Sequence, residues 1–312
     1  MFMMNKEEFA QIAELFGLTA KDLFLLLNNP DIYYCNFKIP KRRGGFREIS
    51  VPSLKLMAIQ RAILKQILKP SFKPLSCCVG FVNNLNILDN VKPHLGNDYI
   101  LKTDIKNFFP SITSSQVNEL FYSLGYSRKI SAFLTKLCCR VGSIPQGAPT
   151  SPMISNMVMV SLDRKIQSIC DSQNFTYTRY ADDITISSNA PIEKGFLDIL
   201  SNLIAQHNMS INMEKTHFYG PNAKKIITGI SISSGEAKLP RFTKRKIRQE
   251  INMIRKFGLL RHMETTGQMS PLFIASLKGK LAFWKQIEPN NLFVIKAFEI
   301  LKNAIKQLDE DG

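Results

Sequence analysis

The chain has 312 residues, 45% of them hydrophobic, and carries 41 Lys and Arg against 25 Asp and Glu. This composition is sufficient for two or three compact units and excludes intrinsic disorder and collagen-like repeats. The net charge of +16 predicts a polyanionic partner, either nucleic acid or an anionic membrane surface, because a small neutral substrate would not explain it.

The N-terminus and the cysteines bear on localisation. Lys6, Glu7 and Glu8 interrupt the first residues, which therefore do not resemble a secretory signal, and no run of about 20 apolar residues could span a bilayer. The adjacent pairs Cys77-Cys78 and Cys138-Cys139 lack the spacing of zinc or redox motifs. We expect a cytoplasmic protein with reduced thiols and no membrane partner.

The N-terminal third is predicted to contain helices and a hairpin. Residues 5–28 have helical spacing that is broken near Gly17, with Thr19 as the N-cap of the second piece. Pro40 to Pro52 are predicted to form a β-hairpin with Gly44-Gly45 in its turn. Residues 53–69 are predicted to be helical.

The middle of the chain alternates between strand and helix patterns. Tyr99 to Asp104 form a predicted strand, and Ser114 or Ser115 is expected to cap a helix that stops at Gly125. A second long helix is expected after Pro152.

The next segment is predicted to contain a short hairpin from Phe175 to Ser187, with Ala181-Asp182-Asp183 at its tip. Pro191 is expected to open a helix. Two further strands, Ser210 to Tyr219 and Lys225 to Ile232, are expected around a Gly-Pro-Asn turn. The succession is β-α-β-β-α-β with antiparallel pairing.

Three acids in this region suggest phosphoryl-transfer chemistry. Asp104 ends an apolar strand, and Asp182 and Asp183 occupy the hairpin. Hard cations such as Mg²⁺ prefer oxygen ligands, and two nearby ions require bridging negative charge. An isolated Asp pair in a hairpin is usually structural, but the combination on a basic chain favours a metal site.

Several motifs resemble those of reverse transcriptases. They are the Asp104 block ending Phe108-Phe109-Pro110-Ser111, the segment Ile144-Pro-Gln-Gly-Ala-Pro149, and Tyr180-Ala-Asp-Asp183. Asn90-Val-Lys-Pro-His94 and Ile227-Thr-Gly229 are similar to motifs of the bacterial retron enzymes, with Val91 and Ile227 as departures. The resemblance covers roughly residues 30–235 at motif level and the following segment only loosely.

The resemblance implies roles for individual residues around the reaction. Asp104 and Asp182 would bind two Mg²⁺ ions, for which Mn²⁺ is a substitute, with Asp183 assisting. Phe109 would exclude a 2′-hydroxyl and so select deoxynucleotides; its structural alternative is a core aromatic. Residues that would contact the incoming nucleoside triphosphate or its surroundings are Lys41, Arg47, Gln146, Gly147 and Lys215.

Other residues are expected to contact RNA. Ile247, Ile251 and Ile254 follow one face of a helix whose remaining faces are basic, which predicts phosphate contacts or, alternatively, a solvated surface. The residues assigned to RNA are His94, Lys244, Arg245, Arg248 and Arg255. A structural role is the alternative for His94, and for Trp284 burial is favoured over base stacking.

The resemblance implies an α+β right-hand polymerase with a β-α-β-β-α-β palm and a mostly helical thumb. The expected domains are N-terminal helices and fingers (1–98), palm (99–235, with fingers elements inserted at 125–155) and an RNA-binding thumb (236–312). The short segment after residue 235 favours a minimal enzyme over a group II intron-like one.

The implied function is RNA-directed DNA synthesis. The enzyme would copy part of a cognate structured noncoding RNA, primed from a guanosine 2′-hydroxyl, to give an RNA–DNA hybrid used in antiviral defence. The implied partners are that RNA, its DNA product, deoxynucleoside triphosphates and an effector protein encoded nearby. The alternatives are another bacterial reverse transcriptase and a non-catalytic RNA-binding scaffold, but a scaffold would need neither the acids nor Gln146-Gly147.

Overall fold

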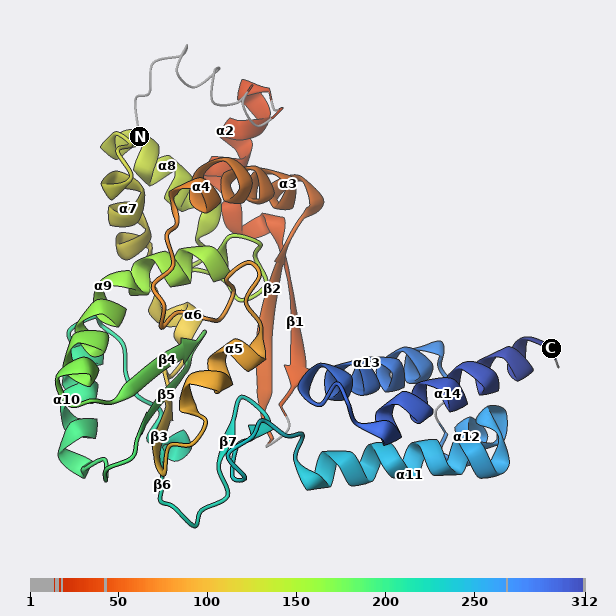
Figure 1. Ribbon diagram of the computed structural model, residues 1–312. Coiled ribbons are helices and arrows are strands. Elements are labelled where there is room, and N and C mark those ends of the chain that lie inside the picture. Colours follow the sequence, from red (N-terminus) through yellow and green to blue (C-terminus); the bar gives the residue numbers. More distant parts are fainter. Residues whose placement is uncertain (1–13, 15–16, 18, 42–43, 268, 311–312) are drawn as a thin grey trace. The chain divides into compact units, whose positions relative to one another are not determined.

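The computed structural model describes residues 14, 17, 19–41, 44–267 and 269–310 (Figure 1). The chain forms two compact units, of which the first comprises Met1–Asn86, Leu101–Ser187 and Ile192–Phe218. The second comprises Ile87–Ile100, Ser188–Pro191 and Tyr219–Gly312. The first predicted helical piece, within residues 5–16, falls almost entirely outside the described residues.

The first unit begins with helix α2 (Ala20–Asn28), and the side chain of Thr19 caps it as predicted by accepting a hydrogen bond from the Asp22 amide. After the 3₁₀ turn η1 (Pro30–Tyr33), strands β1 (Tyr34–Pro40) and β2 (Phe46–Pro52) form an antiparallel hairpin. The first strand therefore starts six residues before the predicted one, since the expected hairpin began at Pro40. The predicted helical stretch after it is confirmed as α3 (Leu54–Ile63), the π-helical turn η2 (Leu64–Leu68) and α4 (Lys69–Ser71).

A four-stranded sheet is the centre of the first unit, with strand order β4-β5-β3-β6. Its strands are β3 (Tyr99–Asp104), β4 (Thr176–Tyr180), β5 (Asp183–Ser188) and β6 (His217–Tyr219). The strand ending in Asp104 and the β4–β5 hairpin are confirmed as predicted. Strand β6 is shorter than expected, because Met213–Lys215 form the 3₁₀ turn η4 within the predicted strand.

Helices of the first unit connect these strands. They are α6 (Phe108–Ser111), α7 (Ser114–Ser123), α8 (Arg128–Cys138), α9 (Ser151–Ser172) and α10 (Lys194–Ala205). Helices α9 and α10 lie beside the sheet (Figure 1). With α9 between β3 and β4 and α10 between β5 and β6, the chain has the predicted β-α-β-β-α-β order.

Two predicted helix starts were wrong by a few residues. Thr113, rather than Ser114 or Ser115, caps α7, because its side chain accepts from the Gln116 amide while the Gln116 side chain accepts from the Thr113 amide. Helix α10 starts at Lys194 with Glu193 at the N-cap, three residues after Pro191. Each error concerns a boundary, and the helices themselves exist.

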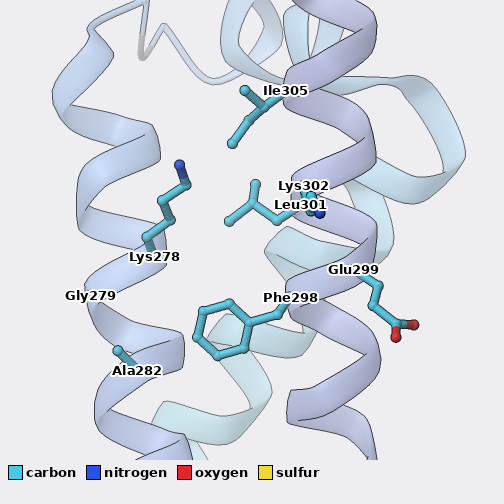
Figure 2. Close-up of a pocket in the computed structure, with 8 residues that line it drawn as sticks. All are labelled: Lys278, Gly279, Ala282, Phe298, Glu299, Leu301, Lys302 and Ile305. Atoms are coloured by element: carbon cyan, nitrogen blue, oxygen red, sulfur yellow. The ribbon is translucent and has the colours of Figure 1, made fainter.

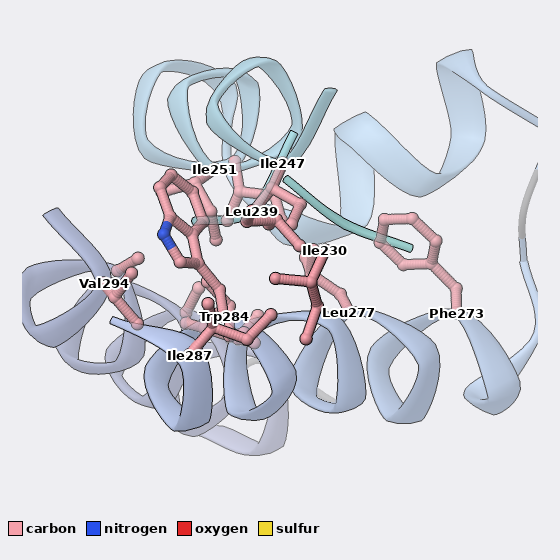
Figure 3. Close-up of a cluster of buried hydrophobic side chains, with 14 of the residues drawn as sticks. Ile230, Leu239, Ile247, Ile251, Phe273, Leu277, Trp284, Ile287 and Val294 are labelled. Carbon is pink, nitrogen blue, oxygen red and sulfur yellow. The ribbon is translucent and has the colours of Figure 1, made fainter. Parts of the chain in front are cut away.

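The second unit is mostly helical. It contains α5 (Ile87–Val91), the 3₁₀ turn η3 (Lys92–His94), α11 (Arg241–Phe257), α12 (Leu259–Thr265), α13 (Pro271–Ile287) and α14 (Leu292–Glu310). Trp284 is completely buried among apolar side chains, as Figure 3 shows, so the predicted burial is confirmed and base stacking is not available to it. The isoleucine stripe Ile247, Ile251 and Ile254 faces the same core.

The expected strand from Lys225 to Ile232 is instead a second tight hairpin. Strands β7 (Ile226–Ile227) and β8 (Ile230–Ser231) pair with each other and form a sheet of their own. Thr228 and Gly229, between them, have positive φ values of 43° and 90°, which is the conformation of a two-residue turn. The fingers, palm and thumb boundaries predicted from the sequence stay a prediction.

Candidate active site

Three acids converge where β3 and the β4–β5 hairpin end. Asp104 is the last residue of β3 and is 5% exposed, and Asp182 lies in the turn between β4 and β5. The Ile105 amide donates to the Asp182 carbonyl at 3.0 Å, which ties the two strand ends together. The structure therefore brings Asp104, Asp182 and Asp183 together as the sequence predicted.

The closeness of the acids alters their affinity for protons. Burial, together with the negative charges of Asp104 and Asp183, raises the pKa of Asp182 to about 6. Burial also raises the pKa of Asp183, against the opposing effect of the Lys102 ammonium group. A cation at this place would relieve the repulsion among the three carboxylates.

Two lysines already provide part of that positive charge. Lys215 donates to Asp104 Oδ2 at 2.8 Å, and its half-exposed side chain reaches the acid from the turn before β6. Lys102 lies two residues before Asp104 on β3 and is 3.9 Å from Asp183 Oδ1. Lys215 was predicted to lie around the incoming nucleotide, near the primer or the metal site. Lys102 was missed, although residues two apart on a strand share a face.

The donor set fits Mg²⁺, because it consists of carboxylate oxygens. Among the residues that the structure describes, no group of three or more His, Cys, Asp or Glu side chains could hold a metal ion as they stand. Mg²⁺ is usually held by one or two carboxylates together with waters and substrate phosphates rather than by a cage of protein ligands. The three acids suit that mode of binding.

Phe109 lies on α6, five residues after Asp104, and is partly exposed, whereas its neighbour Phe108 is buried. The Phe109 ring is close to two others, with centroid distances of 5.5 Å to Phe108 and 6.1 Å to Phe81. Phe109 is therefore not a fully buried core residue. Phe81, which sequence reasoning missed, is 41% exposed and has a positive φ of 62°.

The segment containing Gln146 and Gly147 is docked on strand β2. The Ser50 amide donates to the Gln146 carbonyl at 2.8 Å, and a Cβ on Gly147 would lie 2.8 Å from the Ser50 carbonyl oxygen. Because Gly147 has no side chain, the backbone of β2 can approach it closely. Lys41 and Arg47, near the turn of the β1–β2 hairpin, are exposed.

Comparison with known proteins decides the family. Residues 39–247 match the family model described as "Reverse transcriptase (RNA-dependent DNA polymerase)". The retron Ec86 reverse transcriptase of Escherichia coli is 38% identical over 242 residues, which cover 76% of this chain and 75% of that protein. The retron Ec83 reverse transcriptase of Escherichia coli is 32% identical over 318 residues, which cover 92% of this chain and 94% of that protein.

The chain belongs to the family of bacterial retron reverse transcriptases. It is an RNA-directed DNA polymerase that uses an RNA template and nucleotide substrates, and its fold is that of a right-hand polymerase. Reverse transcriptases generally use divalent metal ions. Among solved structures, a telomerase from Candida albicans is similar at a TM-score of 0.48 and 13% identity, covering 87% of this chain and 61% of that one, which adds nothing to the assignment.

In this reverse transcriptase, the basic residues of α11 have different surroundings. Arg245, Arg248 and Arg255 are exposed, and the Arg248 guanidinium lies 5.6 Å from the centroid of the Trp284 ring. Lys244 is instead mostly buried and donates to Glu288 Oε2 at 2.8 Å. Its charge therefore serves an ion pair within the fold, and the RNA contact predicted for it stays a prediction.

The two motifs that resemble retron enzymes both lie in the second unit. Asn90 Nδ2 donates to Thr228 Oγ1 at 3.5 Å, so the Asn90–His94 motif contacts the β7–β8 turn. His94 is fully buried, and burial lowers its pKa to about 4. The burial favours the structural alternative for His94 over direct RNA contact.

A groove of about 600 Å³ lies between α13 and α14, lined by Ala282, Phe298, Leu301 and Ile305 with lysines at its rim (Figure 2). It is in the second unit, whereas the three acids are in the first.

No helix in the described part of the chain is long and apolar enough to cross a membrane.

Proposed function

We propose that this reverse transcriptase copies part of a cognate structured noncoding RNA, starting from the 2′-hydroxyl of a guanosine in the same RNA. The observation that carries the proposal is the convergence of Asp104, Asp182 and Asp183 in a chain of the retron family. The product would be an RNA–DNA hybrid, the msDNA of a retron. It would act in the cytoplasm in antiviral defence, together with an effector protein encoded nearby.

In this proposal the three carboxylates form the reaction centre. Asp104 and Asp182 hold two Mg²⁺ ions, and Asp183 assists them. When bound, the ions lower the pKa of the primer hydroxyl and neutralise the pyrophosphate leaving group. Lys215 donates to Asp104 Oδ2 at 2.8 Å and so orients that acid before the substrates arrive.

The residues around the acids select and orient the nucleotide. Phe109, whose ring is partly exposed, would collide with a ribose 2′-hydroxyl and so exclude ribonucleotides. The exposed Arg47 and Lys41 bind the triphosphate, for which the planar guanidinium of Arg47 is the better match. Gln146 holds the sugar side of the nucleotide, and its docking on Ser50 couples it to the strand that carries Arg47.

The experiment combines the purified protein with RNA transcribed from the DNA that adjoins its gene, deoxynucleotides and Mg²⁺. We expect DNA that is covalently joined to the RNA and is released by a debranching enzyme. Matched controls are the same RNA with each candidate guanosine changed to adenosine and an unrelated structured RNA. Extension of annealed external primers alone, without RNA-linked DNA, would contradict self-priming and favour another type of bacterial reverse transcriptase.

A further inference from the structure

A completely buried arginine lies two residues before Ala181, which opens the turn that contains Asp182. Arg179, on β4, is 0% exposed and forms a forked pair with Asp163 on α9. Its Nε donates to Asp163 Oδ1 at 2.8 Å and its Nη2 to Asp163 Oδ2 at 2.6 Å. Tyr177, also on β4, donates its hydroxyl to Asp163 Oδ1 at 2.7 Å.

The guanidinium also reaches the hairpin tip. Nη1 of Arg179 donates at 3.0 Å to the carbonyl of Ala181, the residue directly before Asp182. Ala181 has a positive φ of 58°, which is uncommon for a residue with a side chain and persists only where surrounding contacts enforce it. Arg179 provides one such contact, so the conformation of the turn depends on it.

The opposite side of the tip is held by the segment before Phe81. The Val79 amide donates to the Arg179 carbonyl at 2.9 Å, and a Cβ on Gly80 would lie 2.4 Å from the Ala181 nitrogen. Asn156 on α9 joins the two sides, since its Nδ2 donates to the Gly80 carbonyl at 2.8 Å while its Oδ1 accepts from Arg179. The turn is therefore enclosed by a polar network with fixed geometry.

Stability alone does not account for such a network. A buried ion pair is weak evidence for stability, because its desolvation offsets much of the attraction, and apolar replacement of both partners is often neutral. The particular capacity of the arginine fork is geometric: it bonds Asp163 with two nitrogens and the Ala181 carbonyl with a third. Apolar side chains would fill the space but would not hold that carbonyl.

We propose that Arg179 and Asp163 are positioning residues for DNA synthesis, which fix the turn so that Asp182 is held in its reactive place. The pair touches neither template nor nucleotide and acts through the Ala181 carbonyl. This inference rests on the proposed function, since it assumes that Asp182 belongs to the reaction centre.

The test replaces the network by apolar side chains. The triple variant Arg179→Met, Asp163→Leu, Tyr177→Phe removes the buried charges and the hydroxyl that would otherwise lose its acceptor. We expect a folded protein with wild-type RNA affinity, whose kcat for nucleotide incorporation is lower by at least about tenfold while KM changes by less than about threefold. The matched control Tyr177→Phe removes one bond to Asp163 but leaves the Ala181 contact, so its kcat should stay at the wild-type value.

The outcomes separate this inference from the proposed function. A folded triple variant with wild-type kcat would overturn the positioning role. If the triple variant does not fold, Arg179→Lys decides in the same way, because it keeps the charge opposite Asp163 but loses the fork. Normal incorporation by Asp182→Asn would overturn the proposed site itself, whereas an inactive Asp182→Asn beside a fully active triple variant would overturn the positioning role alone.

Discussion

Replacing Gly80 by alanine is expected to disable the enzyme without changing any charged group. The added Cβ would lie 2.4 Å from the Ala181 nitrogen and 2.9 Å from the Tyr180 carbonyl carbon. Ordinary contact requires about 3.5 Å, so the turn or the segment before Phe81 must move by about 1 Å. Both neighbours are backbone atoms, and no side chain can rotate away to make room.

The size of the effect follows from that displacement. A misplacement of about 1 Å costs on the order of 100-fold in rate, which corresponds to about 2.7 kcal/mol of activation free energy. Overpacking also costs about 1–3 kcal/mol of unfolding free energy, so the Tm should fall by several degrees. RNA binding should be retained, because no basic residue is altered.

The assay is single-turnover incorporation of one deoxynucleotide on a pre-annealed primer and template, with Tm and RNA affinity measured on the same preparation. Gly195→Ala is the matched control, since a Cβ there meets no heavy atom within 4 Å. It should incorporate at the wild-type rate. A folded Gly80→Ala enzyme with the wild-type rate would refute the claim that the close approach fixes the turn.

Three further predictions address other parts of the chain. Phe109→Ala should reduce the preference for deoxynucleotides over ribonucleotides by at least about tenfold, measured as a ratio of kcat/KM; unchanged discrimination in a folded variant would make Phe109 only structural. Burial lowers the pKa of His94 from 6.5 to about 4. Between these pH values the unfolded state binds a proton that the folded state does not, so the free energy of unfolding falls by up to about 3 kcal/mol as the pH drops through this range. The free energy of unfolding of His94→Gln, measured by denaturant titration, should not show this fall. If wild type and His94→Gln lose the same stability between pH 7 and pH 4, the prediction is wrong. The double variant Arg245→Ala, Arg248→Ala should bind RNA more weakly and with less salt dependence. Lys244→Ala should mainly lower the Tm, because it leaves Glu288 without its ion pair. If the double variant binds RNA as tightly as wild type, these arginines are only a solvated surface.

The sequence predicted the strand and hairpin of the site well, because their signals are local. Tyr99 to Asp104 form an apolar run that ends in an acid, and the Asp182 turn separates two β-rich segments. The short hairpin around Thr228 and Gly229 was missed, since the β-branched residues on both sides of its two-residue turn resemble one continuous strand. The Thr113 cap was missed because three consecutive hydroxyl residues offer equivalent caps, and the Gln116 side chain decides among them.

Contacts between distant residues could not be predicted in the same way. Gly80 and Arg179 are far apart in the chain, and nothing local indicates that a Cβ on Gly80 would collide with the hairpin. Lys244 looked equivalent to its basic neighbours, but Glu288, 44 residues later, occupies its ammonium group. Burial explains His94 similarly: its motif suggested a functional residue, and only packing shows that the ring is enclosed.

The central claim is that Asp104, Asp182 and Asp183 form the reaction centre, and the most direct test is nucleotide incorporation by Asp182→Asn. The amide is nearly isosteric with the acid but lacks its charge, so we expect incorporation in Mg²⁺ to be abolished while RNA affinity stays close to wild type. Incorporation at the wild-type rate by the folded variant would contradict the account.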